Sequence, residues 1–189
     1  METSTHHSTH TSSEEVHWYA MSVPYNRVMK AKDLLDAKQI ECFVPMCYKV
    51  LTVKGRKTRV HAPAISDLIF VHTTDSLLKA FKQTTTLLQY LVWTADGTSH
   101  KIIVPDRQMA QFIRVCQSHD EELLFLKPEE INLAKGTRVR ILGGSFDGVE
   151  GTFVKVKGHR NRRVVILIDH VSAVAMSEIS PDLIEIIPT

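Results

Sequence analysis

One glycine-punctuated stretch near the C-terminal end constrains the fold more than any other part of the sequence. Residues 135–156 read KGTRVRILGGSFDGVEGTFVKV. Apolar and polar side chains alternate on both sides of the segment from Gly143 to Gly148, and Asp-Gly between two alternating runs is a strong signal for a hairpin turn. Gly151 stands inside the second run, where a missing side chain indicates a bulge or a close backbone approach. The stretch therefore predicts a β-hairpin in a small barrel. No Lys-Ser/Thr pair and no helical pattern follow its glycines, which excludes a phosphate-binding P-loop.

Charge is segregated along the 189 residues, although the net charge is only +2. Residues 18–116 carry 14 basic and seven acidic residues, and residues 135–189 carry eight basic and six acidic residues. The stretch 117–134 between them carries one basic and five acidic residues. An acidic stretch between two basic units is typical of a linker. We therefore expect four parts: a polar, low-complexity tail at 1–16, a domain at 17–117, an acidic linker at 118–133 and a barrel domain at 134–189.

The first of these domains shows strand and helix patterns in the order β-α-β-β-α-β-α. Strands are predicted at 17–23, 40–53 with an interruption at Pro45, 65–72 and 87–94. Helices are predicted at 26–38 with Asn26 as N-cap, at 77–83, and from Pro105 to about Ser118. Residues 54–57 are expected to form the tip of a basic hairpin. The order predicts an α+β fold in which helices pack on an antiparallel sheet.

Several kinds of chemistry are excluded by what the sequence lacks. Cys42, Cys47 and Cys116 form no CxxC pair, which argues for a reducing compartment and against a disulfide framework or a zinc site. The tail contains His6, His7 and His10 without a cysteine or a fixed geometry, so we expect neither a metal nor another cofactor. The sequence has no GxSxG or HExxH motif and no cluster of Asp, Glu and His at ligand spacing, so no catalytic residue is assigned and an enzyme is not expected. There is no apolar run of membrane-spanning length and no secretory signal, so a cytoplasmic protein is expected.

The order of residues within 135–156 resembles the KOW motif of NusG-type transcription factors: a basic strand, Gly, Phe, Gly, and then Gly151 before Thr-Phe-Val. The N-terminal region resembles the same family. Trp18-Tyr19 opens it, and the span from Trp18 to Met46, including the segment ECFVPM, can be laid without a gap on RfaH, a specialised NusG paralogue.

Two shorter segments extend this resemblance. Lys54-Gly55-Arg56-Lys57-Thr58 looks like the basic hairpin of RfaH, and Ile102 to Pro105 matches the segment before its last helix. Together the similar regions cover about 17–117 and 133–188. Among specialised paralogues the chain also resembles the UpxY type, which is linked to capsular polysaccharide operons.

The resemblance implies a NusG-type N-terminal sandwich followed by a small SH3-like KOW barrel. It also implies a monomeric transcription antitermination or elongation factor without a membrane partner. Such a factor would bind the clamp of RNA polymerase and promote processive transcription of specific long operons, such as those for surface polysaccharide. Because the chain matches RfaH in its N-terminal region, we expect antitermination rather than termination. The β-branched run from Val164 to Ile168 disfavours a helix, so we expect the C-terminal domain to be a five-stranded barrel and not a helical hairpin.

The resemblance also implies sites. RNA polymerase contacts are expected at an apolar group and at two nearby lysines: Tyr19, Ile65, Leu68, Phe70, Lys79 and Lys82. The alternative for the apolar group is that its members are core residues of the sheet. Contacts to non-template DNA, through phosphates and base stacking, are expected at Tyr25, Arg27, Lys30, Lys38, Lys54, Arg56 and Lys57. The basic pair that RfaH uses after its first strand is replaced here by Pro24-Tyr25, and a solvated surface is the alternative for the lysines. The barrel is expected to bind termination factor Rho or a small ribosomal subunit protein through Arg138, Arg140, Phe146 and Arg160.

Two other functions remain open on the sequence. One is a general NusG-like factor that couples transcription to Rho or to the ribosome. The other is a KOW-type protein that binds RNA or the ribosome. The excess of basic residues over 135–189 is weak for a dedicated ribosomal RNA binder, which usually carries a strong basic footprint.

Overall fold

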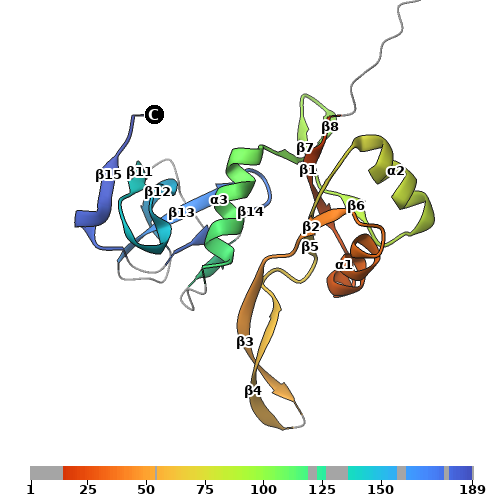
Figure 1. Ribbon diagram of the computed structural model, residues 1–189, viewed down its shortest axis with the longest axis horizontal. Coiled ribbons are helices and arrows are strands. Elements are labelled where there is room, and N and C mark those ends of the chain that lie inside the picture. Colours follow the sequence, from red (N-terminus) through yellow and green to blue (C-terminus); the bar gives the residue numbers. More distant parts are fainter. Residues whose placement is uncertain are drawn as a thin grey trace, which may run out of the picture.

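The computed structural model describes residues 15–53, 55–118, 123–126, 136–156, 161–176 and 179–188. Its N-terminal half is built on an antiparallel sheet with the order β2-β5-β1-β6, in which β9 also pairs with β1. The strands are β1 (His17–Ser22), β2 (Glu41–Phe43), β5 (Leu68–Thr73), β6 (Gln89–Tyr90) and β9 (Ile103–Val104). Three helices accompany the sheet: α1 (Val28–Asp36), α2 (Asp75–Thr84) and α3 (Asp106–Cys116). Figure 1 shows α1 and α2 on the side of the sheet away from the C-terminal half, and α3 between the two halves.

The starts of two helices differ from the sequence prediction for local reasons. Asn26, the expected cap of α1, adopts a left-handed conformation with φ of 55°. The N-cap is therefore Arg27, and its side chain makes no capping hydrogen bond. In α2 the hydroxyl of Thr74 accepts a hydrogen bond from the backbone N–H of Leu77 at 3.3 Å. This cap starts the helix two residues before the predicted boundary.

Two hairpins leave the sheet of the N-terminal half. The longer one joins β3 (Met46–Val53) to β4 (Arg56–Pro63), and we call it the ribbon. Gly55 in its turn has φ of 78°, which favours glycine, whereas Lys54 lies outside the described residues. Figure 1 shows the ribbon projecting away from both halves of the molecule. The shorter hairpin joins β7 (Val92–Ala95) to β8 (Thr98–Lys101), and β8 was not predicted.

The C-terminal half is an antiparallel sheet of six described strands in the order β10-β14-β13-β12-β11-β15. These strands are β10 (Leu124–Leu126), β11 (Thr137–Ile141), β12 (Glu150–Lys155), β13 (Arg162–Ile168), β14 (Ser172–Ala175) and β15 (Ile184–Ile186). Five of them fall where the barrel was expected. The sixth, β10, lies in the stretch expected to be a linker and pairs with β14.

Gly151 marks the close approach that the sequence indicates. A Cβ atom on this glycine would lie 2.7 Å from the carbonyl oxygen of Val165 and 2.8 Å from Cγ1 of Val164. β12 and β13 therefore pack together at a point where only glycine fits without a shift of the neighbouring strand. The predicted close backbone approach is confirmed.

Two apolar clusters lie on opposite faces of the sheet of the N-terminal half. One fills the space between the sheet and helices α1 and α2. The other joins the opposite face of the sheet to α3 and continues into the C-terminal half, where it includes Val139, Ile166 and Val174. The predicted α+β class is confirmed. In the described part of the chain, no helix is long and apolar enough to cross a membrane.

Candidate partner-binding and nucleic-acid interfaces

The apolar residues expected at a polymerase contact do not share one face of the sheet. Side chains alternate between the two faces of a strand, so Leu68 and Phe70 point to one face and the neighbouring Ile69 and Val71 to the other. Tyr19 pairs with Val71 and belongs to the cluster under α1 and α2. Leu68 and Phe70 belong to the opposite cluster, which contains α3. The sequence therefore grouped residues that the pleat of the sheet separates.

Phe70 and Leu68 are buried in this structure. Phe70 is fully buried, and its ring lies 5.7 Å from the ring of Phe112 on α3 in an edge-to-face arrangement. Phe43 on β2 meets the same Phe112 ring at 6.3 Å. Ile65, just before β5, is half-buried against this cluster. Leu68, Phe70 and Ile65 are thus covered by α3 and by the C-terminal half, whereas Tyr19 is not.

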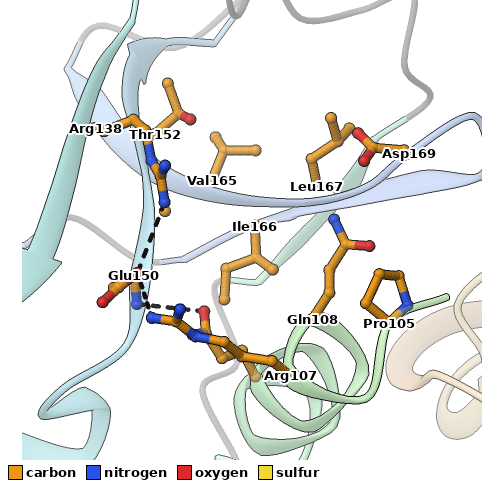
Figure 2. A pocket seen from close by; sticks show the side chains of 12 residues that line it. Pro105, Arg107, Gln108, Arg138, Glu150, Thr152, Val165, Ile166, Leu167 and Asp169 are labelled. Carbon is orange, nitrogen blue, oxygen red and sulfur yellow. Dashed lines mark hydrogen bonds and ion pairs between the residues drawn. The ribbon is translucent and has the colours of Figure 1, made fainter. Parts of the chain in front are cut away.

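Polar side chains join α3 to the C-terminal half around Glu150, as Figure 2 shows. An ion pair of 2.8 Å connects Arg107 of α3 to the Glu150 carboxylate, and the backbone N–H of Glu150 donates to Gln111 at 3.3 Å. Arg114 donates to the carbonyl oxygens of Asp147 and Ser145 at 2.7 Å and 3.3 Å. Arg107, Gln111 and Glu150 also line a cavity of about 340 Å³ between α3 and strands β12 and β13.

Two arginines of β11 complete the charge cluster around Glu150. Arg140 approaches the carboxylate at 2.9 Å and also pairs with Glu185 at 3.3 Å, and Arg138 lies 3.7 Å away. The hydrogen bond from Arg140, assisted by the positive charges of Arg107 and Arg138, lowers the pKa of Glu150 below its ordinary value. Two of the residues expected to bind a barrel partner, Arg138 and Arg140, are therefore engaged within the molecule.

The remaining barrel candidates are divided between core and undescribed chain. Phe146 lies in a short 3-10 helix at Gly144–Phe146 and packs, half-buried, against the large apolar cluster. Arg160 lies outside the described residues. The structure thus brings Arg138 and Arg140 together but does not place Phe146 beside them as an exposed side chain.

The two lysines expected to face polymerase, Lys79 and Lys82, both lie on α2. Asp75 forms ion pairs with Lys79 at 2.7 Å and with Lys101 of β8 at 2.5 Å. These bonds, that from Lys101 first, lower the pKa of Asp75. Lys82 lies 3.9 Å from the centre of the Tyr90 ring, a cation–π contact, and partial burial together with the nearby charge of Lys101 lowers its pKa. Lys79 and Lys82 are therefore close in space, as the sequence implied, but each already has a partner.

The loop after β1 presents an aromatic side chain with a basic neighbour. Tyr25 is 81% exposed, has φ of 63°, and lies 5.1 Å below the guanidinium of Arg27. Lys30 on α1 and Lys38 beyond it are exposed. An exposed ring next to cationic groups can stack on a base while the cations meet phosphates. This part of the expected nucleic-acid interface is therefore accessible.

The basic residues of the ribbon divide between its two faces. Arg56 and Lys57 are both exposed, and they point to opposite faces because they are adjacent on β4. On the Lys57 face the structure brings Arg59 together with two residues that the sequence reading did not select, Tyr48 and His61. Only the pairing of β3 with β4 brings them together. The alternation of His61, Arg59 and Lys57 along β4 was the available signal.

The three cysteines line one cavity of about 510 Å³ together with Phe43, Val44 and Met46. Burial raises the pKa of the Cys42 thiol to about 11 and raises that of Cys116 further, so both are poor nucleophiles. No group of three His, Cys, Asp or Glu side chains suited to a metal ion occurs among the described residues. The histidines of the tail, His6, His7 and His10, lie outside them.

Comparison with known proteins finds a matching family model and a solved structure. Residues 16–113 match the family model described as transcription termination factor NusG. A solved structure of NusG from Thermotoga maritima, described by its domain interaction, shares 16% identity with this chain, covers 92% of it and is itself covered to 98%, with a TM-score of 0.43. Because the family model spans more than half of the 189 residues, the chain belongs to the NusG family of non-enzymatic transcription elongation and termination factors.

Proposed function

We propose that this protein is a transcription antitermination factor that binds RNA polymerase and promotes processive transcription of specific long operons. The match of residues 16–113 to the NusG family carries the proposal, because it covers the sheet, its helices and the ribbon. A factor of this kind needs no catalysis. It acts by binding one state of the polymerase more tightly than another and so shifting the population toward elongation.

The polymerase contact is proposed at the face of the sheet that carries Leu68 and Phe70, with Ile65 at its border. In the conformation described here α3 and the C-terminal half cover this face. Binding through it therefore requires both α3 and the C-terminal half to move away and expose apolar surface, which is typical of an interaction site. Lys79 and Lys82 are proposed as a second contact, and Tyr19 supports the sheet from the opposite face.

Nucleic acid is proposed to meet two exposed elements of the N-terminal half. One is the loop that carries Tyr25 and Arg27, and the other is the ribbon. Residues 46–63 contain five Lys or Arg residues and no Asp or Glu, so the ribbon is positively charged throughout. Such an element attracts phosphates in a salt-dependent manner.

The C-terminal half is proposed to recruit a further partner, Rho or a small ribosomal subunit protein. If the C-terminal half separated from α3, Arg138 and Arg140 would still pair with Glu150, because Glu150 also belongs to the C-terminal half. Release would also uncover the side of β12 and β13 that faces Arg107 and Gln111.

The test is transcription in vitro through an intrinsic terminator with purified RNA polymerase. Added protein is expected to increase the fraction of transcripts that extend past the terminator. Ile65→Asp is expected to reduce this effect and the binding to polymerase, whereas Val92→Asp, which alters an exposed apolar residue on the β7–β8 hairpin, serves as the matched control. Increased termination with the wild-type protein would overturn antitermination.

The description of the matching family favours a second candidate, a factor that acts in termination. This candidate predicts the opposite sign in the same assay once Rho is added. Shorter transcripts that depend on both Rho and the C-terminal half would support it.

A further inference from the structure

The ribbon is a two-stranded element on which no third strand pairs in the described part of the chain. Eight residue pairs join β3 to β4, from Met46 with Pro63 to Val53 with Arg56. Figure 1 shows that the distal part stands clear of the helices and of the C-terminal half. Large apolar residues on it remain in solvent, including Val50, which is 66% exposed. Exposed side chains of the ribbon, such as Tyr48 and Val50, are therefore accessible to a partner.

Antiparallel pairing places directly opposite residues on the same face. The pairs Tyr48 with His61, Val50 with Arg59 and Thr52 with Lys57 define one face, which we call the stacking face. The other face carries Lys49, Leu51, Arg56 and Thr58. The positive charges that appear mixed in the sequence are thus sorted by the pleat into two sets.

The aromatic rings of the ribbon, Tyr48 and His61, both lie on the stacking face. The guanidinium of Arg59 lies 4.2 Å from the centre of the Tyr48 ring. The centre of the His61 ring lies 5.0 Å from the centre of the same Tyr48 ring. Tyr48 itself is 56% exposed. Aromatic rings and arginine planes are the groups on which unpaired bases stack, and Lys57 beyond them can meet a phosphate.

The opposite face is tied to the body of the protein at its base. The amine of Lys49 donates to the carbonyl oxygens of Pro63 and Ala64 at 2.5 Å and 3.0 Å. The hydrogen bonds of this lysine therefore hold the ribbon to the segment that leads into β5. The remaining cation of that face whose side chain is described, Arg56, has no aromatic ring directly opposite, because its partner is Val53.

We propose that the stacking face, formed by Tyr48, Val50, Arg59, His61 and Lys57, is a binding site for single-stranded nucleic acid. The inference deepens the proposed function, on which it rests, by assigning the contact to one face of the ribbon. Single strands are favoured over duplexes because a duplex keeps its bases stacked on each other, which leaves only phosphates for the ribbon. The absence of Asp and Glu from residues 46–63 gives the site the charge that such a ligand requires.

The test measures fluorescence anisotropy of the full chain with labelled single-stranded RNA and DNA of the same sequence, about 12 nucleotides long, and with the matching duplex. The single strands are expected to bind more tightly than the duplex at equal salt, and the RNA and DNA arms identify which of the two is preferred. Tyr48→Ala is expected to weaken binding about fivefold or more, because stacking on one aromatic ring is lost. Lys57→Gln is expected to reduce the slope of log affinity against log salt by about 0.7, the value for one phosphate contact on a single strand.

A matched pair of charge-conserving variants isolates the face. Arg59→Lys keeps the charge but removes the plane that covers Tyr48, and is expected to weaken single-strand binding. Arg56→Lys makes the same change on the opposite face and is expected to leave binding within twofold. All variants alter exposed positions, and circular dichroism with a thermal melt verifies that each remains folded.

Equal effects of the two Arg→Lys variants, unchanged affinity in Tyr48→Ala, or tighter binding to the duplex would overturn the proposal. The proposal would also be overturned if Tyr48→Ala bound polymerase more weakly in the absence of nucleic acid but bound single strands as well as the wild type does. The ribbon would then contact protein. Terminator readthrough with normal polymerase binding but no single-strand binding would overturn this inference and leave the proposed function standing. Face-specific single-strand binding without any readthrough would do the reverse.

Discussion

The sheet of the N-terminal half and the ribbon are both antiparallel, and only Val44 and Pro45 separate β2 of the one from β3 of the other. They differ in what covers their faces. Five of the six residues of β5 are buried, between α1 and α2 on one side and α3 on the other, whereas none of the eight residues of β4 is. Antiparallel pairing is therefore stabilised in the sheet by helices packed on both faces, and in the ribbon mainly by the hydrogen bonds between its two strands. Apolar side chains in the sheet should set stability, and those on the ribbon should set recognition.

The largest effect is expected from Phe112→Ala. Phe112 is fully buried in the cluster that the sheet shares with α3 and the C-terminal half, and its ring meets Phe43 and Phe70. Removal of a buried phenyl ring costs about 3–5 kcal/mol. Urea denaturation followed by circular dichroism measures the loss. A fall of less than about 1 kcal/mol in the free energy of unfolding would contradict a core shared by the sheet, α3 and the C-terminal half.

Effects of intermediate size are expected from alanine substitutions at two glycines, one in the C-terminal sheet and one in the ribbon. Gly151→Ala places a Cβ against the backbone of β13 and is expected to cost about 1–3 kcal/mol through overpacking. Gly55→Ala in the ribbon turn meets no atom within 4 Å, so its cost is limited to about 1 kcal/mol of backbone strain at positive φ. Thermal unfolding of both variants gives the ranking. A larger loss for Gly55→Ala would show that the ribbon is more tightly coupled to the fold than its exposure indicates.

Glu150→Gln tests the ion-pair cluster that joins α3 to the C-terminal half. The pKa of Glu150 is held below its ordinary value of 4.5, first by the hydrogen bond from Arg140. The folded state therefore binds this proton less readily than the unfolded state, so the stabilisation is complete above about pH 4.5 and is lost as the pH falls through the lowered pKa. We expect a loss of about 1 kcal/mol at pH 7, because the arginine partners are solvent-exposed.

The measurement for Glu150 is the free energy of unfolding of the wild type and the variant between pH 3 and pH 7. The two curves should converge at the acidic end, and added salt should reduce the difference at pH 7. A difference that grows as the pH falls would contradict the sign of the pKa shift.

The smallest effect is expected from Val50→Thr. Val50 is exposed on the ribbon, so the added hydroxyl stays hydrated and the free energy of unfolding should change by less than about 0.5 kcal/mol. Denaturant titration compares it with the wild type. A loss above about 1 kcal/mol would indicate that Val50 is packed, and the comparison between ribbon and sheet would lose its basis.

Much of the fold follows from local sequence signals. Periodicity locates β1, α3 and the paired strands around Gly151, because each depends on neighbouring residues. Strand β10 was missed because four apolar residues between acidic stretches, Leu123 to Leu126, have no local pattern, and the partner strand β14 lies far along the chain. The N-cap of α1 was misplaced because the left-handed conformation of Asn26 depends on the turn that Pro24 and Tyr25 make, not on the capping ability of its side chain.

The candidate sites were harder to predict than the elements that carry them. Basic residues of the ribbon are visible in the sequence, but their division between two faces depends on the register of β3 against β4. Tyr19 was grouped with Leu68 and Phe70, although strand alternation between Phe70 and Val71 and the pairing of Tyr19 with Val71 place it on the opposite face. Burial of Phe70 beneath α3 depends on packing between distant segments, for which the sequence carries no local signal.

Helix α3 also bears on the order in which the chain folds during synthesis. All strands of the N-terminal sheet precede it, whereas every strand of the C-terminal sheet follows it. The ribosome needs about 3–12 s to add the residues from Cys116 to Met176 at ordinary elongation rates. During that interval α3 can cover Phe70 before the partners of Arg107, Gln111 and Arg114 in the C-terminal half have been synthesised. The nascent N-terminal half would thus fold first, with the side of α3 that later faces the C-terminal half still exposed. Another partner could bind this side of α3 before the C-terminal half competes for it.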